Sequence, residues 1–316
     1  MTNTSVRIDL WDVGQGDCSV ITLPSGELII IDTGPTGSPI VSWLERNPSL
    51  IIYAIILTHN DSDHVGALTP ILALSGRVKN IFALFETQRS KEEFNAIFRL
   101  AYELHNAGKV VFDRLESPKT IWSDPAIKTE LRVAFPDTVD IQLAGCVNKS
   151  SAIIELVAND NTVAVWPGDN TVTQVSKKIS QMPVHLLHGP HHGAPLDLKN
   201  KAIDPSLDQI KPAHVFVSVG TKNTYNHPQK KYLDKLVSRQ VQVTCSQLNR
   251  LCDRKTCLAG KPVFDSASRM GLWPNPHGVA CRGCMRFTLS DGVLQADSFV
   301  AEHRRRIEKL HAPMCL

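Results

Sequence analysis

The chain has 316 residues, enough for one large α/β domain or two smaller ones with a real hydrophobic core. Hydrophobic residues make up 42% and charged residues 21%, as in ordinary globular proteins, and the net charge of +3 neither requires nor excludes a nucleic-acid partner. The longest apolar runs, such as residues 51–57, are far shorter than the roughly 20 residues that span a bilayer. No signal-peptide core is visible, so we expect a cytoplasmic protein without a membrane span.

The predicted elements alternate between strands and helices. Apolar or alternating runs bounded by Gly and Pro predict strands, and apolar residues at intervals of three and four predict helices. In chain order we expect strands at 6–11, 18–23 and 27–31, a helix at 38–46, a strand at 51–57, helices at 64–76 and 91–107, strands at 131–135, 152–157 and 162–166, a helix at 172–179, strands at 184–187 and 215–219, a helix at 229–238, and a hairpin of 287–290 with 293–298. This order indicates a layered α/β domain with helices outside packed sheets.

A cysteine-rich segment at residues 245–284 interrupts this order and is interpreted as an insertion in a domain that covers residues 1–300. Its CxxxxC and CxxC spacings predict a structural zinc site, because an insertion this small cannot build its own core. The predicted ligands are Cys252, Cys257, Cys281 and Cys284, with Cys245 as an alternate. The alternative is that these cysteines are free thiols.

A basic segment at residues 301–316 is predicted to form a C-terminal helix or tail. It contains the run HRRR at 303–306, followed by Lys309. Two interpretations stay open, a solvated helix face and a phosphate-binding surface.

The stretch LTHNDSDHVG at residues 57–66 follows a predicted buried strand and concentrates ligand-type side chains. His59, Asp61, Asp63 and His64 occupy four of six successive positions. Imidazole nitrogens beside carboxylate oxygens suit zinc, manganese or iron(II), and the loop holds too many ligands for a single tetrahedral site. The stretch therefore predicts a site for two metal ions.

Further candidate ligands follow other predicted strands. Asp32 follows the apolar run of IIIDTG, and Asp169 ends VAVWPGD. The run HLLHGPHHGAP contains His188, His191 and His192, and His227 follows the strand at 215–219. Taken singly, an aspartate here could be a turn residue or a helix cap, and His227 could be a surface imidazole. Taken together, we expect these side chains to converge at one edge of the sheets.

These motifs stand in a recognisable order: DVGQGD, IDTG, THNDSDHVGAL, NKSS, PGD, PHHGA and SVGTKNTYNHP. The series resembles the metallo-β-lactamase superfamily, and more narrowly the ComEC-like branch, the hydrolase domain of bacterial DNA-uptake proteins. The resemblance covers residues 6–244 and the closing hairpin. It implies a four-layer αββα sandwich with a dinuclear metal centre at the sheet edge.

The resemblance also implies a role for each matching residue. His59 and Asp61 would bind one metal, Asp63 and His64 the other, and Asp169 would bridge the two. The PHHG pair would supply a ligand to the second metal, with His191 favoured over His192, and Asp32 would orient a loop histidine. The superfamily usually has a third-motif histidine near residues 148–151, and its absence here leaves the first metal short of a protein ligand.

Two divalent ions, Zn²⁺ or Mn²⁺, would activate a water molecule for in-line displacement. Asp63 could accept the proton of that water, and His227 and Lys222 could contact a substrate phosphate or the leaving oxygen. We therefore expect a phosphodiesterase, most simply a nuclease that acts on DNA, with nucleic acid as its substrate and a possible protein partner. The alternatives are a hydrolase of small lactones, esters or amides and a non-catalytic regulatory module.

Overall fold

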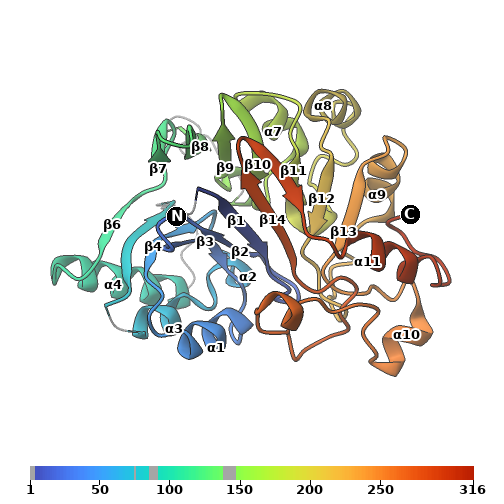
Figure 1. Ribbon diagram of the computed structural model, residues 1–316, viewed down its shortest axis with the longest axis horizontal. Helices are drawn as coiled ribbons and strands as arrows, with labels where there is room; N and C mark the ends of the chain where they lie inside the picture. Colours follow the sequence, from blue (N-terminus) through green and yellow to red (C-terminus); the bar gives the residue numbers. More distant parts are fainter. Residues whose placement is uncertain (1–3, 75, 85–91, 138–146) are drawn as a thin grey trace.

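The computed structural model describes residues 4–74, 76–84, 92–137 and 147–316. Its strands form two large sheets with helices outside them (Figure 1). Residues 75 and 91, at the ends of two predicted helices, lie outside the described residues. Within the described ranges, no helix combines the length and the apolar character needed to cross a membrane.

The first sheet has eight strands in the order β15-β14-β1-β2-β3-β4-β5-β6. They are β1 (Val6–Leu10), β2 (Cys18–Thr22), β3 (Leu28–Thr33), β4 (Ile52–Leu57), β5 (Val78–Ala83), β6 (Val111–Arg114), β14 (Met285–Ser290) and β15 (Val293–Ala296). Strands β3 to β6 are parallel neighbours, whereas β1 pairs antiparallel with both β2 and β14. The hairpin predicted at the end of the chain forms, and its first strand pairs with the N-terminal strand β1.

The second sheet has seven strands in the order β13-β12-β11-β10-β9-β8-β7. They are β7 (Lys119–Asp124), β8 (Thr129–Phe135), β9 (Ile153–Ala158), β10 (Asn161–Trp166), β11 (Leu186–His188), β12 (His214–Val217) and β13 (Gln242–Cys245). Strands β10 to β13 are parallel, and β7 to β10 are antiparallel neighbours. Each sheet thus has one parallel block, and the candidate ligands follow strands of these two blocks.

Three hydrophobic clusters define four layers. Ile29 and Ile31 of β3 point into a cluster shared by both sheets, while Leu28 and Ile30 point into a cluster under the helices of the first sheet. Successive side chains on a strand face opposite sides, so β3 is buried on both faces and is apolar from Leu28 to Ile31. A third cluster lies between the second sheet and its helices. The predicted αββα sandwich is confirmed.

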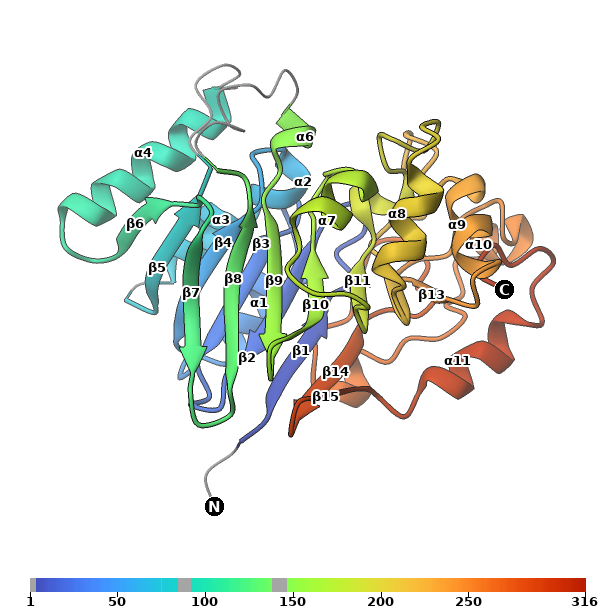
Figure 2. The ribbon, with the colours of Figure 1, turned by 90° about the horizontal axis from the view of Figure 1, so that it is seen from above.

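The helices are divided between the two outer faces (Figures 1 and 2). Residues of α1 (Pro39–Arg46), α3 (Leu68–Ala73) and α4 (Glu92–Asn106) pack in the cluster of the first sheet. Residues of α7 (Val172–Lys178), α8 (Ile203–Ile210) and α9 (Lys230–Val237) pack in the cluster of the second. A short α6 (Val147–Ser150) precedes β9.

The helix predicted at residues 64–76 is in fact two helices, α2 (Ser62–Val65) and α3. Gly66 lies between them, where a Cβ atom would come within 2.5 Å of the backbone nitrogen of Thr36. No strand is predicted from the sequence at β5, β6 or β7. These strands carry polar residues at exposed positions, and β6 and β7 are edge strands with little apolar patterning.

The cysteine-rich insertion and the C-terminal segment lie at the same end of the molecule (Figure 2). The insertion contains α10 (Arg254–Ala259), and the C-terminal helix is α11 (Val300–Ile307). His303 and Ile307 of α11 are buried, and the backbone nitrogen of Ala312 donates to the carbonyl of Cys252. Residues 301–316 therefore pack on the body of the protein.

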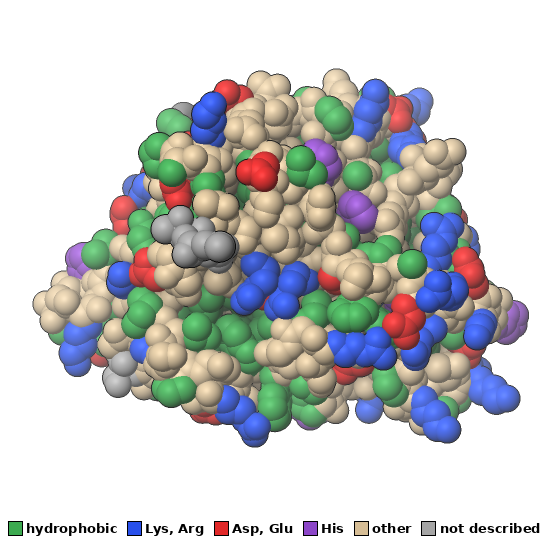
Figure 3. Space-filling model, in the orientation of Figure 1, with side chains coloured by type: hydrophobic (Ala, Val, Ile, Leu, Met, Phe, Trp, Pro, Cys, Tyr) green, Lys and Arg blue, Asp and Glu red, His purple; other side chains and the backbone are tan. Residues whose placement is uncertain are grey.

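The arginines of α11 are mostly paired with acidic side chains of the same helix. Arg304 lies 3.6 Å from Glu308, and Arg306 lies 2.7 Å from Glu302. In the view of Figure 3, basic side chains form separate groups among acidic and apolar ones rather than one continuous band. These pairings favour the solvated helix face over the phosphate-binding surface.

Candidate metal centre

The candidate ligands meet because the parallel blocks of the two sheets end at the same edge. Asp32 closes β3, and His59 follows β4 in the first sheet. Asp169 follows β10, and His191 and His192 follow β11 in the second sheet. The carboxyl ends of parallel strands are where α/β folds usually place a site.

One group of side chains surrounds the Oδ2 atom of Asp169. The Nε2 atom of His59 lies 3.5 Å from this oxygen, and Nε2 of His191 lies 3.4 Å from it. Asp61 reaches the same group, with its Oδ2 atom 3.7 Å from Nε2 of His59. We call this group the first position. It holds His59, Asp61, His191 and one oxygen of Asp169.

A second group surrounds the other oxygen of the same carboxylate. The Nε2 atoms of His64 and His192 lie 3.3 Å and 3.6 Å from Oδ1 of Asp169. Asp63 closes this group, with its Oδ2 atom 3.2 Å from Nε2 of His192. We call this group the second position, and Asp169 is shared between the two.

The structure places the PHHG histidines differently from the preferred sequence interpretation. His192 lies at the second position, and His191 lies at the first, near the place where the third-motif histidine is absent. The amide of Asn148, from that region, donates to Oδ2 of Asp169 at 3.0 Å and lies 3.5 Å from Nε2 of His191. The first position is therefore not short of a protein side chain.

An unusual backbone directs the two adjacent histidines to different positions. Both have left-handed conformations, with φ of 49° for His191 and 53° for His192. Non-glycine residues rarely adopt this conformation, and successive ones store strain that the surrounding contacts must hold. Here the backbone nitrogen of His191 donates to Gly168, and Nδ1 of His192 lies 3.0 Å from the carbonyl of Ser218.

The donor atoms of both positions fit divalent cations. Nε2 of His59, His64 and His192 and Oδ1 of Asp169 are buried and have no hydrogen-bond partner. Buried polar atoms are almost always satisfied, so such orphans on converging side chains fit a bound cation. Imidazole nitrogens and carboxylate oxygens are the donors that zinc and manganese accept.

The electrostatics of the cluster favour positive charge at its centre. Burial disfavours a charged His59, but the carboxylate of Asp169 outweighs it and raises the pKa of this imidazole to about 9. Burial also opposes charge on His64 and His192, but nearby carboxylates hold the pKa of both imidazoles well above the usual range. The pKa of Asp63 falls to about 2, because its contacts with His192 and the charge of His64 outweigh burial. Bound cations would supply the same positive charge.

Asp32 lies behind the second position and contacts the far side of His64. Its Oδ2 atom is 2.7 Å from Nδ1 of His64 and accepts from the hydroxyl of Thr58, while its Oδ1 atom accepts from the backbone nitrogen of Thr58. With Nδ1 occupied, the free Nε2 of His64 points toward Asp169. This placement agrees with the orienting role expected for Asp32.

Asp17 is a supporting residue that the sequence analysis did not assign. Its two oxygens lie 3.2 Å from Nδ1 of His192 and 3.3 Å from Nδ1 of His188. His188, noted among the strand-end histidines, therefore contacts this carboxylate instead of Asp169. Asp17 belongs to the motif DVGQGD, which was part of the resemblance, but only the tertiary contact with His192 reveals its role.

His227 lies against the centre, whereas Lys222 does not. The ring centroid of His227 is 4.9 Å from that of His191, and burial near the other imidazoles lowers its pKa to about 4. Oε1 of Gln15 accepts from the backbone of Gly220, which turns the amide nitrogen of Gln15 toward Nδ1 of His227, 3.5 Å away. Lys222 instead lines a neighbouring pocket together with Gln15.

The four predicted zinc ligands of the insertion do not come together. The chain turns at Gly283, whose φ is 69°, and Cys284 enters the cluster under the first sheet with Cys18. Cys252, Cys257 and Cys281 lie in the cluster of the second sheet, together with Cys245 and Cys315. In the described part of the chain, no three cysteine sulfurs lie within 4.8 Å of one another. In this second cluster, Sγ of Cys281 lies 3.5 Å from Nε2 of His303.

Comparisons with known proteins agree with this geometry. Residues 11–79 match the family model described as "Metallo-beta-lactamase superfamily". The chain is 23% identical over 273 residues to ComE operon protein 3 of Bacillus subtilis (strain 168). The aligned region covers 77% of this chain and 32% of that protein. The chain thus spans about a third of the length of the curated relative it matches.

Two solved structures are also similar. The metallo hydrolase Igni18 of Ignicoccus hospitalis has a TM-score of 0.47 and 14% identity, over 77% of this chain and 95% of that one. The metallo-β-lactamase fold protein YhfI of Bacillus subtilis has a TM-score of 0.48 and 10% identity, over 76% and 96%. The match to ComE operon protein 3 supports the ComEC-like branch. Residues 11–79 are thus similar to the metallo-β-lactamase superfamily of hydrolases, and the two-sheet fold with candidate ligands at its edge agrees with that similarity.

Proposed function

We propose that the chain is a metal-dependent phosphodiesterase that cleaves nucleic acid with two divalent cations, Zn²⁺ or Mn²⁺, at the candidate metal centre. The observation that carries the proposal is the division of ligands around Asp169. His59 and His191 face one oxygen of this carboxylate and Asp61 adjoins His59, while His64 and His192 face the second oxygen and Asp63 adjoins His192. A pair of cations on either side of one carboxylate is the arrangement typical of phosphodiester hydrolysis.

The residues of the centre divide the work of this reaction. Divalent cations, when bound, lower the pKa of water and stabilise charge on the attacking and leaving oxygens. Asp63 is partly exposed, with 28% of its side chain accessible, and it is the candidate to accept the proton from the attacking water. The amide nitrogen of Gln15 faces Nδ1 of His227, which leaves Nε2 of this ring to donate to a substrate oxygen.

An exposed aromatic side chain beside the centre supports a nucleic-acid substrate. Tyr225 is 67% exposed, and its ring centroid lies 5.8 Å from that of His227. Aromatic rings next to a cationic site are the surfaces on which unpaired bases stack. The similarity to ComE operon protein 3 supports the same expectation through the ComEC-like resemblance.

The test is hydrolysis by the purified chain loaded with Mn²⁺ or Zn²⁺. We expect cleavage of single- or double-stranded DNA and of bis(p-nitrophenyl) phosphate, with loss of both activities in His59→Ala and in Asp169→Ala. Asp9→Asn serves as a control, because Asp9 is buried among arginines away from the centre. Absence of cleavage, or equal cleavage by wild type and His59→Ala, would overturn the proposal.

A small-molecule hydrolase is the second candidate, and one observation favours it. His191 completes the first position, so this chain does not lack the ligand set that hydrolases of lactones and amides use. The same preparations should therefore be assayed with a lactone and a β-lactam. A kcat/KM for either that exceeds the value for every phosphodiester would make this the function of the centre.

A further inference from the structure

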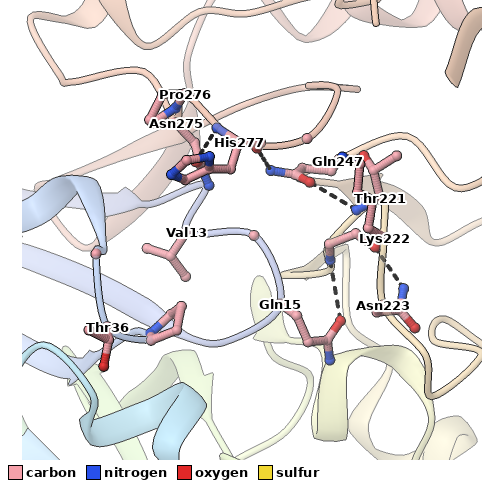
Figure 4. A pocket seen from close by; sticks show the side chains of 15 residues that line it. Val13, Gln15, Thr36, Thr221, Lys222, Asn223, Gln247, Asn275, Pro276 and His277 are labelled. Atoms are coloured by element: carbon pink, nitrogen blue, oxygen red, sulfur yellow. Dashed lines mark hydrogen bonds between the residues drawn. The ribbon is translucent and has the colours of Figure 1, made fainter. Parts of the chain in front are cut away.

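A pocket of about 470 Å³ lies next to the metal centre and is not part of it. Four segments line it: residues 13–15, residues 35–37, residues 220–223 with Gln247, and residues 275–278 of the insertion. Figure 4 shows Asn275, Pro276 and His277 on one side, Thr36 and Gln15 on the opposite side, and Lys222 and Asn223 on a third. This volume is within the range of small-ligand sites.

One side chain connects the pocket to the centre. Gln15 lines the pocket, and its amide lies 3.5 Å from Nδ1 of His227, whose ring lies against His191. Gly16 follows in the same loop, and its Cβ would come within 2.3 Å of the carbonyl of Asp63. A ligand that extends past His227 would meet Gln15, which lines this pocket.

The walls of the pocket are rigid because their amides are already paired. Oδ1 of Asp12 accepts from the backbone of Gly14 and from the amides of Gln247 and Asn275. The side-chain amide of Gln247 also donates a hydrogen bond to the carbonyl of His277. The insertion loop is thereby tied to the loop that carries Gln15, so the pocket exists before a ligand arrives.

The groups that stay free define the ligand. Among the described residues, neither the side chain of Lys222 nor that of His277 enters a hydrogen bond or an ion pair, and both are exposed. No carboxylate is among the described lining residues, and Val13, Pro35 and Pro276 supply apolar surface. An ammonium group binds a phosphate, and flat apolar walls accept a base or a sugar.

We propose that this pocket binds the nucleotide next to the scissile phosphodiester, with Lys222 on its phosphate and residues 275–278 of the insertion against its base or sugar. The inference rests on the proposed function and names the part of the substrate that this chain recognises. It also assigns a role to the insertion, which forms one wall of a substrate site. Lys222 then binds substrate instead of taking part in the chemistry, the other role the sequence allowed.

The test measures binding separately from cleavage. A fluorescein-labelled single-stranded trinucleotide is titrated in EDTA into wild type, Lys222→Ala, His277→Ala and the control Lys255→Ala, an exposed lysine of α10 outside the pocket. Fluorescence anisotropy should show a Kd about tenfold higher for Lys222→Ala and several-fold higher for His277→Ala, with Lys255→Ala unchanged. The slope of log Kd against log salt should fall by about 0.7 in Lys222→Ala, the change expected for one lost phosphate contact on a single strand.

Failure of the pocket and failure of the proposed function give different results. If Lys222→Ala and His277→Ala bind the trinucleotide like wild type, the pocket proposal is wrong even if the protein cleaves DNA. If wild type cleaves no phosphodiester but the two variants lose binding of the trinucleotide, the pocket proposal is supported and the proposed phosphodiesterase function is wrong. With an active enzyme, the ratio of kcat/KM for the trinucleotide to that for bis(p-nitrophenyl) phosphate should fall in both variants.

Discussion

His191 and His192 are adjacent in the sequence, yet they face opposite oxygens of the carboxylate of Asp169. Nε2 of His191 lies 3.4 Å from Oδ2, and Nε2 of His192 lies 3.6 Å from Oδ1. Two successive left-handed residues separate their ring centroids by 6.1 Å. One tetrapeptide, PHHG, therefore contributes to both candidate metal positions.

This separation predicts different metal losses for the two single variants. His191→Ala should lose the cation of the first position, and His192→Ala should lose the cation of the second. The metal content of each variant should fall from two equivalents per chain to about one. Asp169→Ala should lose both, because each position uses one of its oxygens. Elemental analysis after dialysis against Mn²⁺ or Zn²⁺ measures this, with Cys284→Ala as the control that keeps wild-type content. Loss of the same cation in both histidine variants would contradict the assignment.

Asp17 should tune the second position without binding a cation there. Asp17→Asn replaces a carboxylate that lies 3.2 Å from Nδ1 of His192 by a neutral amide. Such supporting changes typically weaken metal affinity by about 10–100-fold. Competition with a chelator should show weaker binding of one of the two cations in Asp17→Asn. Asp9 is also a buried aspartate, and the control Asp9→Asn should keep the wild-type affinity for both cations. Equal affinities in Asp17→Asn and wild type would rule the role out.

Gly16 should be intolerant of any side chain. Its φ is 140°, and a Cβ would lie 2.3 Å from the carbonyl of Asp63 and 2.8 Å from Pro35. Gly26 is the matched control, because it also has a positive φ but has nothing within 4 Å of its Cβ position. We expect Gly16→Ala to lower the free energy of unfolding by about 2 kcal/mol more than Gly26→Ala, and to reduce metal binding at Asp63 as well. Urea unfolding measures the first effect; similar values for the two variants would contradict it.

Asp12 predicts a pH dependence of stability. Burial raises the pKa of Asp12 to about 7, although hydrogen bonds from Gly14, Gln247 and Asn275 lower it in part. A carboxyl group with a raised native pKa binds more protons in the folded state, so its contribution to stability is present below pH 4 and is lost as the pH rises through 7.

Asp12→Asn removes this titration and keeps an oxygen that can accept the same three hydrogen bonds. Between pH 5 and pH 8, the free energy of unfolding of the variant should rise relative to that of wild type by about 1 kcal/mol or more. Chemical unfolding at the two pH values measures the difference. A gain that does not change with pH would show that Asp12 is ionised throughout this range.

Tyr225 should contribute binding energy to nucleic acid through its ring. Tyr225→Ala removes the exposed aromatic face beside His227, which should weaken binding of a single strand by about 1–3 kcal/mol. Tyr225→Phe keeps the face and should bind like wild type. Anisotropy titrations with a labelled oligonucleotide distinguish the two, and an equal loss in both variants would point to the hydroxyl instead.

Much of the fold and most of the candidate ligands could be predicted from the sequence, because they depend on local pattern. β3 and β4 are recognisable as apolar runs that end in Asp32 and His59, and parallel strands bring such ends to one edge. Edge strands such as β6 and β7 have no such pattern, since one side faces solvent and little apolar surface is buried. The split of the helix at 64–76 depends on a close approach of Thr36 to Gly66, which no local pattern records.

The sequence by itself determined which residue types are available: the ligands of LTHNDSDHVG, the shared Asp169, the PHHG pair and the cysteines of the insertion. Only the tertiary structure decided which oxygen each histidine faces, that Asp17 lies behind His192, and that Cys284 is separated from Cys281. The physical reason is the different distance range over which chain spacing and tertiary packing fix a side chain. Spacing along the chain fixes a side chain only to within a turn or a strand, whereas ligation depends on ångström distances between segments that the packed sheets bring together.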